Sequence, residues 1–259
     1  MSITDHVYIP DTQVKDGVPL DHLTALGNYL VEKQPAVIVH AGDHADMPSL
    51  SMFDIGKRQF EGRRYRKDIE AAQAGMEALL SPIWEYNKRR AAQKMKQYRP
   101  RMVLTLGNHE ARIQRAVDSD ARLEGTLSMD DLEYQKFGWE VIPFLAPIRV
   151  DGISYVHYVQ QDNSPGAVSR AHLIAQRRHG SYTVGHRQTL DYYVSPHLNP
   201  DTGKRVQVLM CGAFYQHEEE YMGAQGNQHW RGCVHKQEVD NGQYDPQFLS
   251  LSYFMRNWL

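Results

Sequence analysis

Short apolar runs near the start of the chain alternate with segments in which apolar residues recur at helical spacing. The runs at 7–9, 36–41 and 102–106 are continuous, which is typical of buried parallel strands. Leucines at helical spacing predict a helix over about 19–33, with Pro19 at its first position. A strand, a helix and a second strand in this order favour an α/β fold built on a parallel sheet.

The second half of the chain carries the pattern of paired strands. Asp151-Gly152 lies between two extended apolar segments and predicts a tight hairpin over 148–155. The other predicted elements are strands at 182–184, 190–194, 205–210, 234–239 and 248–254, a helix at 167–179, and a helix with a loop over 111–136. The apolar end of the chain, 249–254, is either an inner strand or a sheet edge used for dimerisation.

Residues 57–101 differ from the rest of the chain in charge. They hold thirteen basic and five acidic residues, a net charge of +8, whereas the other 214 residues sum to -10. The composition predicts one or two helices, with Pro82 as a break or a first-turn residue. The basic residues concentrate at the two ends, which fits an inserted helical hairpin whose ends meet near the strand termini. Such a segment is either a solvated helical face or a contact surface for nucleic acid.

The remaining composition limits the classes of protein that fit. A chain of 259 residues, 41% of them hydrophobic, suits a single domain over 1–259. The net charge of -2 does not call for a membrane partner. Cys211 and Cys233 form no disulfide framework and are expected to be buried thiols in a reducing compartment. The N-terminus has no apolar signal core and no run approaches a membrane span, so we expect a cytoplasmic protein.

Five predicted strand ends carry side chains that can bind a cation. In order along the chain, they are Asp11 with Gln13, Asp43, Asn108 with His109, His157, and His186 with Gln188. In α/β sheets, ligands gather outside the carboxyl ends of the strands. One polar strand end is ordinary, but five in series predict a shared metal site. Oxygen donors with imidazoles suit Mn, Fe or Zn, and two ions about 3.5–4 Å apart can clamp a phosphate.

This ordered set resembles the calcineurin-like metallophosphoesterases. Their pattern is D-x-H, G-D-x-x-D, G-N-H-E/D, a lone His and G-H-x-H. The matching blocks are Asp11-Thr12-Gln13, Gly42-Asp43-His44-Ala45-Asp46, Gly107-Asn108-His109-Glu110, His157 and Gly185-His186-Arg187-Gln188. Residues 227–232 and the hairpin after them are similar to phage-encoded members, for which the host cytoplasm is the expected compartment. The resemblance implies a four-layer α/β/β/α sandwich of two mixed sheets, with 57–101 as a basic helical insertion.

The resemblance also implies roles for the strand-end residues. Asp43 would bridge two divalent metal ions. His109 would face the phosphate as a proton donor or a charge stabiliser, oriented by Asp46. The remaining ligands would be Asn108, His157 and His186 at one ion, and Asp11, Gln13 and Gln188 at the other.

Two departures from the family pattern affect the metal expectation. Gln13 and Gln188 stand where histidines are expected, and an amide oxygen is a weaker, harder donor than imidazole. We therefore expect one strong site and one weaker site that prefers Mn or Mg to Zn. Mn is favoured overall, with Mg, Fe and Zn as alternatives.

The substrate follows less directly from the sequence. Arg112, His44 and Arg187 are candidate substrate contacts. Arg112 could equally be a surface residue on a helix, Arg187 could equally face solvent, and His44 ranks below His109. We expect a phosphodiester first, with nucleic acid as one form through segment 57–101. A phosphomonoester or phosphoprotein is the alternative, although Met47 stands where protein phosphatases have arginine. A catalytically impaired metal- or phosphate-binding module is the third class.

Overall fold

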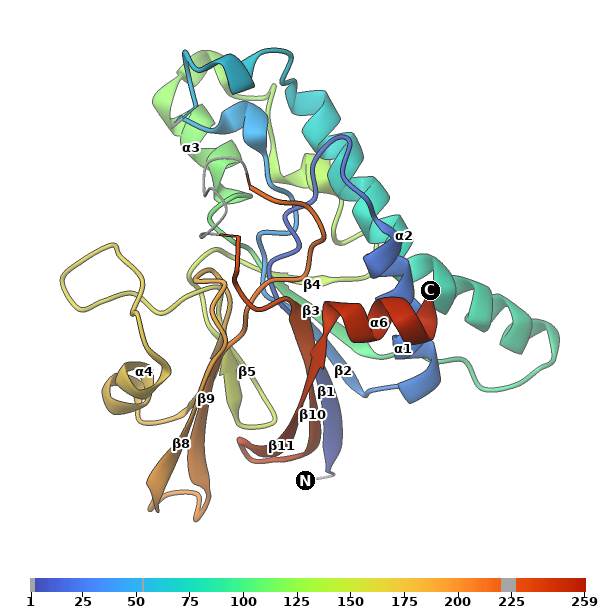
Figure 1. The fold of residues 1–259 in the computed structure, drawn as a ribbon, viewed down its shortest axis with the longest axis vertical. Coiled ribbons are helices and arrows are strands. Elements are labelled where there is room, and N and C mark those ends of the chain that lie inside the picture. The colour runs from blue at the N-terminus through green and yellow to red at the C-terminus, as the bar shows by residue number, and fades with distance from the viewer. Residues whose placement is uncertain (1–2, 53, 220–226) are drawn as a thin grey trace.

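The computed structural model describes residues 3–52, 54–219 and 227–259, and it contains two mixed β-sheets (Figure 1). The first sheet has the order β11 (Gln243–Ser250), β10 (Gly232–Asp240), β1 (Thr4–Ile9), β2 (Val37–His40), β3 (Arg101–Thr105) and β4 (Glu140–Ile142). Strands β1 to β4 are parallel, and β10 runs antiparallel to β1 and β11. The α/β class is therefore confirmed.

The second sheet packs against the first through a shared apolar layer. Its order is β5 (Ile148–Val150), β6 (Ile153–Tyr155), β7 (Ser181–Val184), β9 (Arg205–Met210) and β8 (Asp191–Leu198). Strands β6, β7 and β9 are parallel, and the predicted Asp151-Gly152 turn joins β5 to β6. The layer between the sheets includes Val39 and Val103 from one and Tyr155 and Leu209 from the other.

Helices cover the outer face of each sheet. Helices α1 (Asp21–Lys33), α2 (Tyr65–Ala92) and α6 (Leu251–Trp258) form one core with the first sheet. Helix α4 (Ala171–Arg178) packs on the second sheet, on the far side of the molecule (Figure 1). The loops that leave the carboxyl ends of the strands therefore share one rim. Along the described residues, no helix is both long and apolar enough to cross a membrane.

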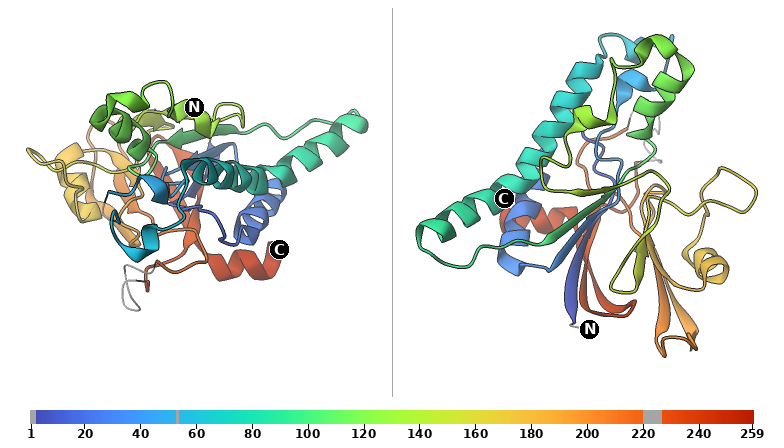
Figure 2. Two further views of the ribbon diagram at one scale, coloured as in Figure 1. Left: turned by 90° about the horizontal axis from the view of Figure 1, so that it is seen from above. Right: turned by 180° about the vertical axis from the view of Figure 1, so that it is seen from behind.

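The basic segment folds differently from our expectation. Helix α2 is one continuous helix of 28 residues with Pro82 inside it, so the predicted break and helical hairpin are both wrong. A helix of this length spans about 42 Å, which places its two ends far apart. Figure 2 shows one end among the rim loops and the other extending beyond the sheet. The two basic ends therefore cannot form one surface.

The part of α2 that contains Pro82 packs closely against α1. Gly27 of α1 lies against this part of α2, and a Cβ atom at Gly27 would lie 2.3 Å from the Leu79 carbonyl oxygen and 2.8 Å from Pro82 Cγ. Proline in a helix interior removes one backbone hydrogen bond and is unfavourable in isolation. Here the ring fills the space that glycine leaves on the facing helix.

The C-terminal strand was predicted at 248–254, but it lies at 243–250. Strand β11 ends at Ser250, whose side chain accepts a hydrogen bond from the Tyr253 N–H and caps α6. Phe254 and Trp258, four residues apart, both pack edge-on against Tyr29 of α1. Helical spacing thus outweighs the apolar character of residues 251–254, which are neither an inner strand nor a sheet edge. Leu249 and Ser250 do lie at a sheet edge, because β11 is the outermost strand of the first sheet.

Smaller differences concern element ends. Helix α1 begins at Asp21, which leaves Pro19 outside it, and α4 is shorter than predicted because Ala167 pairs with Gln160. The 111–136 region contains α3 (Ala111–Ser119) and the short 3-10 helices η3 (Ala121–Leu123) and η4 (Met129–Leu132). Two further 3-10 helices, η1 (Pro48–Leu50) and η2 (Arg58–Phe60), precede α2. Both cysteines are buried and free, as predicted.

Candidate metal centre

The rim brings together three side chains that each offer one ligand atom. Oxygen or nitrogen atoms of Asp43, His157 and His186 all lie within 4.8 Å of one another. Asn108 Oδ1 joins them, 2.9 Å from His157 Nε2 and 2.7 Å from His186 Nδ1. Asp43, Asn108, His157 and His186 follow β2, β3, β6 and β7 respectively. These are the four residues that the resemblance assigns to the stronger site.

Glycine permits the close approach of two of these loops. A Cβ atom at Gly107 would lie 2.1 Å from Asp43 Oδ1, so no other residue fits there without displacing the carboxylate. The same Oδ1 accepts a 2.8 Å hydrogen bond from the His109 N–H. The Gly107-Asn108-His109 turn therefore fixes both the position of Asp43 and the orientation of the residues after β3.

The tautomer of His157 suits a metal ligand. Its Nδ1 lies 2.8 Å from the Ala41 carbonyl oxygen, which can only accept, so Nδ1 carries a proton. The neutral ring then presents the Nε2 lone pair, 3.3 Å from Asp43 Oδ2. Burial lowers the pKa of His157, but Asp43 outweighs burial and raises it to about 9. A cation at this position would take the place of that proton.

The charge balance at the rim also fits a cation. Burial opposes ionisation of Asp43, yet His157 and His109 bring its pKa well below the ordinary value. Burial raises the pKa of Asp11 to about 7. Its Oδ1 accepts from the His186 N–H, while Oδ2 is buried with no hydrogen-bond partner among the described residues. Unpaired buried oxygens of this kind are what a bound cation satisfies.

Four of the predicted ligands have left-handed backbone conformations. The φ angles are 40° at Gln13, 47° at Asp43, 65° at His186 and 54° at Gln188. Residues other than glycine rarely adopt positive φ, and such strain clusters at functional sites. The strain indicates that the surrounding structure holds these side chains in place before any ligand binds.

Glu110 braces the loop that carries Asp43. Its buried carboxylate accepts hydrogen bonds from the backbone N–H groups of Asp43, His44, Ala45 and Gly107, at 2.6–3.0 Å. Burial raises the pKa of Glu110 above its ordinary value. Glu110 therefore holds the loop after β2 and the Gly107 turn after β3 together.

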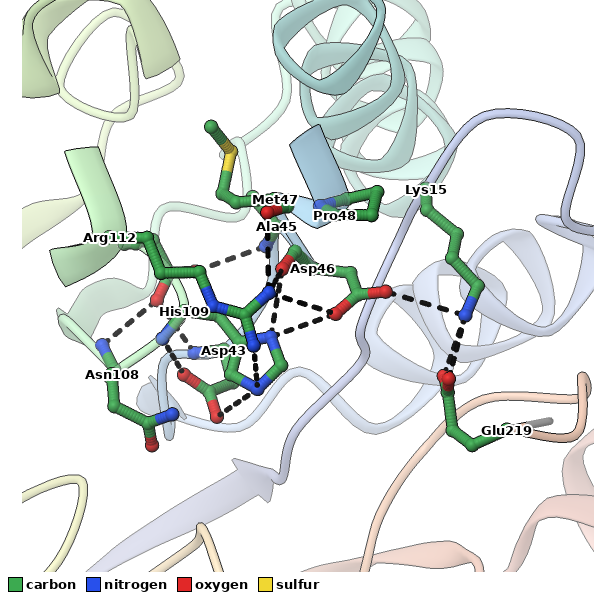
Figure 3. Close-up of polar contacts among 12 residues, drawn as sticks. Lys15, Asp43, Ala45, Asp46, Met47, Pro48, Asn108, His109, Arg112 and Glu219 are labelled. Atoms are coloured by element: carbon green, nitrogen blue, oxygen red, sulfur yellow. Dashed lines mark hydrogen bonds and ion pairs between the residues drawn. The ribbon is translucent and has the colours of Figure 1, made fainter. Parts of the chain in front are cut away.

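His109 and Asp46 form a pair beside the cluster (Figure 3). His109 Nδ1 lies 2.8 Å from Asp46 Oδ1 and 2.8 Å from the Asp46 carbonyl oxygen. Its Nε2 faces Asp43 Oδ2 at 3.8 Å. Burial lowers the pKa of His109, but Asp43 and Asp46 together raise it to about 9. Nε2 therefore faces the cluster while Nδ1 shares its proton with Asp46.

Arg112 lies over this pair, with its guanidinium fixed by backbone oxygens. Its Nη1 donates to the carbonyl oxygens of Asp46 at 2.9 Å and Met47 at 3.2 Å, and Nη2 lies 3.4 Å from His109 Nε2. A positive group is thus held beside the face of His109 that could meet an anion. Substrate contact by Arg112 stays a prediction.

Two residues that the sequence did not single out complete this part of the site. Lys15 Nζ lies 3.3 Å from Asp46 Oδ2, and 2.8 Å and 2.9 Å from the Glu219 carboxylate oxygens (Figure 3). His217 Nε2 lies 2.8 Å from Glu219 Oε1. Lys15 and Glu219 are 204 positions apart, so no local motif could have paired them.

An open groove of about 870 Å³ begins at His109 and Asn108. It is lined by six basic and seven acidic side chains: Lys15, Lys57, Arg63, Arg64, Lys67, Arg112, Asp16, Asp46, Asp54, Glu61, Asp68, Glu218 and Glu219. Several of these form ion pairs, such as Arg63 with Asp54 and Lys67 with Asp16. Among the described residues that line the groove, none comes from 88–101. The groove is therefore mixed in charge rather than basic.

Three predicted site residues lie differently from the rest. His44 is fully buried, with Nδ1 2.8 Å from the Thr12 hydroxyl and Nε2 2.9 Å from the Ala72 carbonyl oxygen, so the prediction that it contacts substrate is wrong. It packs beneath α2 instead. Arg187 is exposed, and its contact with substrate is untested. Gln188 Oε1 accepts a 2.9 Å hydrogen bond from the buried Tyr215 hydroxyl, a contact with no sequence signal.

Comparisons with known proteins add nothing to this geometry. No protein-family model matches the chain, and no curated protein matches it at a significant level. The relation to the calcineurin-like metallophosphoesterases therefore rests on the motif series and stays a prediction.

Proposed function

We propose that this protein hydrolyses phosphate esters at a site for two divalent cations, with Mn favoured and a phosphodiester as the first candidate substrate. The observation that carries the proposal is the convergence on one rim of the four residues Asp43, Asn108, His157 and His186 with the His109–Asp46 pair. Two mixed sheets with helices on both outer faces are consistent with the four-layer sandwich of the metallophosphoesterases.

The bound cations would supply Lewis acidity toward the phosphate oxygens and the attacking water. Asp43, Asn108, His157 and His186 would hold one cation, and Asp43 and Asp11 would help to hold the other. The unpaired buried oxygen of Asp11 and the raised pKa of His157 indicate that this donor set accepts positive charge. Burial and the neighbouring His157 lower the pKa of His186 to about 4, which keeps that ring neutral, as a ligand must be.

His109 would act as the proton donor in this reaction. Its Nδ1 proton is held by Asp46, so the ring is fixed and Nε2 can give its proton to the oxygen of the leaving group. Asp43 and Asp46 raise the pKa of His109, and the contact with Asp46 would favour the protonated ring when Asp43 holds the cations. Arg112 would hold a phosphate oxygen next to it.

The groove limits the substrate. Its mixture of acidic and basic side chains suits a compact ester better than a long nucleic acid, whose phosphates need a run of unpaired cations. Among the described residues of the basic segment, those that line the groove all lie in its first part, 57–68. Nucleic acid therefore becomes the less favoured form of the phosphodiester, and a phosphomonoester remains the alternative.

A substrate panel with Mn²⁺ tests the proposal. We expect turnover of bis-p-nitrophenyl phosphate above that of p-nitrophenyl phosphate, and less with DNA, RNA or a phosphopeptide. Binding of DNA and RNA at about 50 and 200 mM salt gives a second measure, because phosphate contacts depend steeply on salt. Absence of turnover with every substrate and metal, together with metal binding, would favour the impaired binding module instead.

A further inference from the structure

The two glutamines of the predicted second metal site have different surroundings. Gln13 Oε1 is buried and has no hydrogen-bond partner among the described residues. Gln188 Oε1 accepts a 2.9 Å hydrogen bond from the Tyr215 hydroxyl. The sequence gives no reason to separate the two residues, since both stand where the resemblance implies a ligand. In the structure they differ, because the Gln13 side-chain oxygen lacks a hydrogen-bond partner among the described residues and the Gln188 oxygen has one.

Two of the buried side-chain oxygens that have no hydrogen-bond partner among the described residues lie in the segment after β1. Asp11 Oδ2 and Gln13 Oε1 are the buried side-chain oxygens without a described partner in this segment. The Gln13 backbone N–H donates to the Asp43 carbonyl oxygen at 2.9 Å, which ties the segment to the loop of the bridging carboxylate. Leaving a buried oxygen unpaired is unfavourable, and a cation would satisfy both atoms.

Gln188, in contrast, already has a partner that is itself fixed. Tyr215 is fully buried, its ring stacks on His217 at 4.5 Å, and the Arg231 guanidinium lies 4.9 Å from the ring centroid. A cation at Gln188 Oε1 would have to share this oxygen with the Tyr215 hydroxyl, whereas Gln13 Oε1 accepts no hydrogen bond from a described residue. With its oxygen on Tyr215, the rest of the Gln188 amide is an NH₂ group, which repels a cation.

We infer that Asp11, Gln13 and Asp43 hold the second cation and that Gln188 is not a ligand but the hydrogen-bond partner of Tyr215. The inference rests on the proposed function, because it assumes that the rim binds two cations. It gives the second cation oxygen donors from these residues, a set that favours Mg²⁺ or Mn²⁺ over Zn²⁺.

A matched pair of variants tests the inference by Mn²⁺ binding. Free Mn²⁺ is measured by electron paramagnetic resonance during titration of the full chain, so the readout is independent of activity. We expect a tight and a weak ion in the unchanged protein. Gln13→Ala should weaken the weak ion about tenfold or more, comparable to losses seen when supporting residues of metal sites are removed. Gln188→Ala should leave it unchanged.

Tyr215→Phe provides the second arm without altering either glutamine. It removes the hydroxyl that occupies the Gln188 oxygen and keeps the buried ring. We expect the weak ion to bind as well as before or more tightly. If Tyr215 instead orients Gln188 as a ligand, this variant weakens the ion. The tight ion is the internal control for folding, because its predicted ligands are unchanged in all three variants.

The outcomes separate this inference from the proposed function. Equal losses in Gln13→Ala and Gln188→Ala, or a loss in Tyr215→Phe, would overturn the assignment of Gln188 while two-ion binding in the unchanged protein still supports the metallophosphoesterase proposal. If the unchanged protein binds no Mn²⁺, both proposals fail together.

Discussion

Lys15 holds Asp46 from the side opposite His109: its ammonium lies 3.3 Å from Asp46 Oδ2, while His109 Nδ1 lies 2.8 Å from Oδ1. Glu219 fixes the ammonium in turn. The two oxygens of one carboxylate thus have separate partners, and the orientation of His109 depends on a contact between distant parts of the chain.

Removing the ammonium should impair turnover without affecting metal content. We expect Lys15→Met to lower kcat about tenfold, within the range seen for residues that orient a reactive group, with little change in KM. Lys67→Met is the matched control, because Lys67 also lines the groove but pairs with Asp16. Steady-state kinetics and bound Mn²⁺ should be measured together. Equal kcat values in the two variants would show that Asp46 needs no support from Lys15.

Replacing the proposed proton donor, His109, should affect turnover and not metal binding. His109→Ala should reduce kcat by about 10²–10⁴-fold and leave the number of bound Mn²⁺ ions unchanged, because the proposed role of His109 is to donate a proton and not to bind a metal. Loss of metal in this variant would contradict the assigned role. Asn108→Ala is the contrasting variant, and it should lose metal affinity.

The pH dependence of turnover should report the same group. His109 acts in its protonated form, so activity should fall on the alkaline side as the proton is lost. Asp46 is one of the carboxylates that raise the pKa of His109. Asp46→Asn should therefore move the alkaline limb of kcat to lower pH as well as reducing its height. A limb that stays in place would exclude His109 as its source.

Replacing Glu110 should lower the free energy of unfolding and not affect turnover alone. Glu110→Gln replaces one acceptor oxygen with an NH₂ group that faces backbone N–H donors, and breaking such a buried charged network reduces stability by about 3 kcal/mol. Urea unfolding should show this loss, and the exposed Glu77→Gln should change stability by less than about 0.5 kcal/mol. An equally small effect at Glu110 would mean that the loop does not depend on it.

A buried histidine far from the rim predicts acid sensitivity. His6 is fully buried between Tyr155 and Asp151, and burial lowers its pKa to about 4. In the unfolded chain His6 takes up a proton near pH 6.5, whereas in the folded protein it does so only near pH 4. The contribution of neutral His6 to the free energy of unfolding is therefore complete above pH 6.5 and is lost as the pH falls from 6.5 to about 4. The loss amounts to about 3 kcal/mol.

Unfolding curves at several pH values test this. His6→Gln should flatten the decline in stability between pH 6.5 and 4, whereas the exposed His172→Gln should leave it unchanged. An unaltered slope in His6→Gln would assign the acid sensitivity to other groups.

The sequence could predict those site residues that directly follow the carboxyl ends of strands. Parallel strands deliver their carboxyl ends to one rim, so Asp43, Asn108 and His157 could be grouped without a structure. This grouping depends only on local sequence and sheet topology. The separate role of His109, next to Asp46, came instead from the resemblance to the metallophosphoesterases and stays a prediction.

The rest depends on contacts that local sequence does not encode. Tyr215 meets Gln188 only after the segment following β9 returns to the rim. His44 follows Asp43 directly, but its burial is set by α2, which comes later in the chain. The paths of α2 and α6 were missed because packing on α1 outweighs the local signals of Pro82 and of an apolar C-terminus.

The close contact between Gly27 of α1 and the Pro82 turn of α2 means that the sequences of these two helices cannot change independently. Any side chain at position 27 would collide with the Leu79 carbonyl oxygen and the Pro82 ring, so α2 would have to move away first. Since the start of α2 also lines the groove, such a shift would reshape the groove. In a related protein with another residue at position 27, α2 should therefore also differ in sequence. Because α2 lines the groove, the substrate preference of that protein should differ as well.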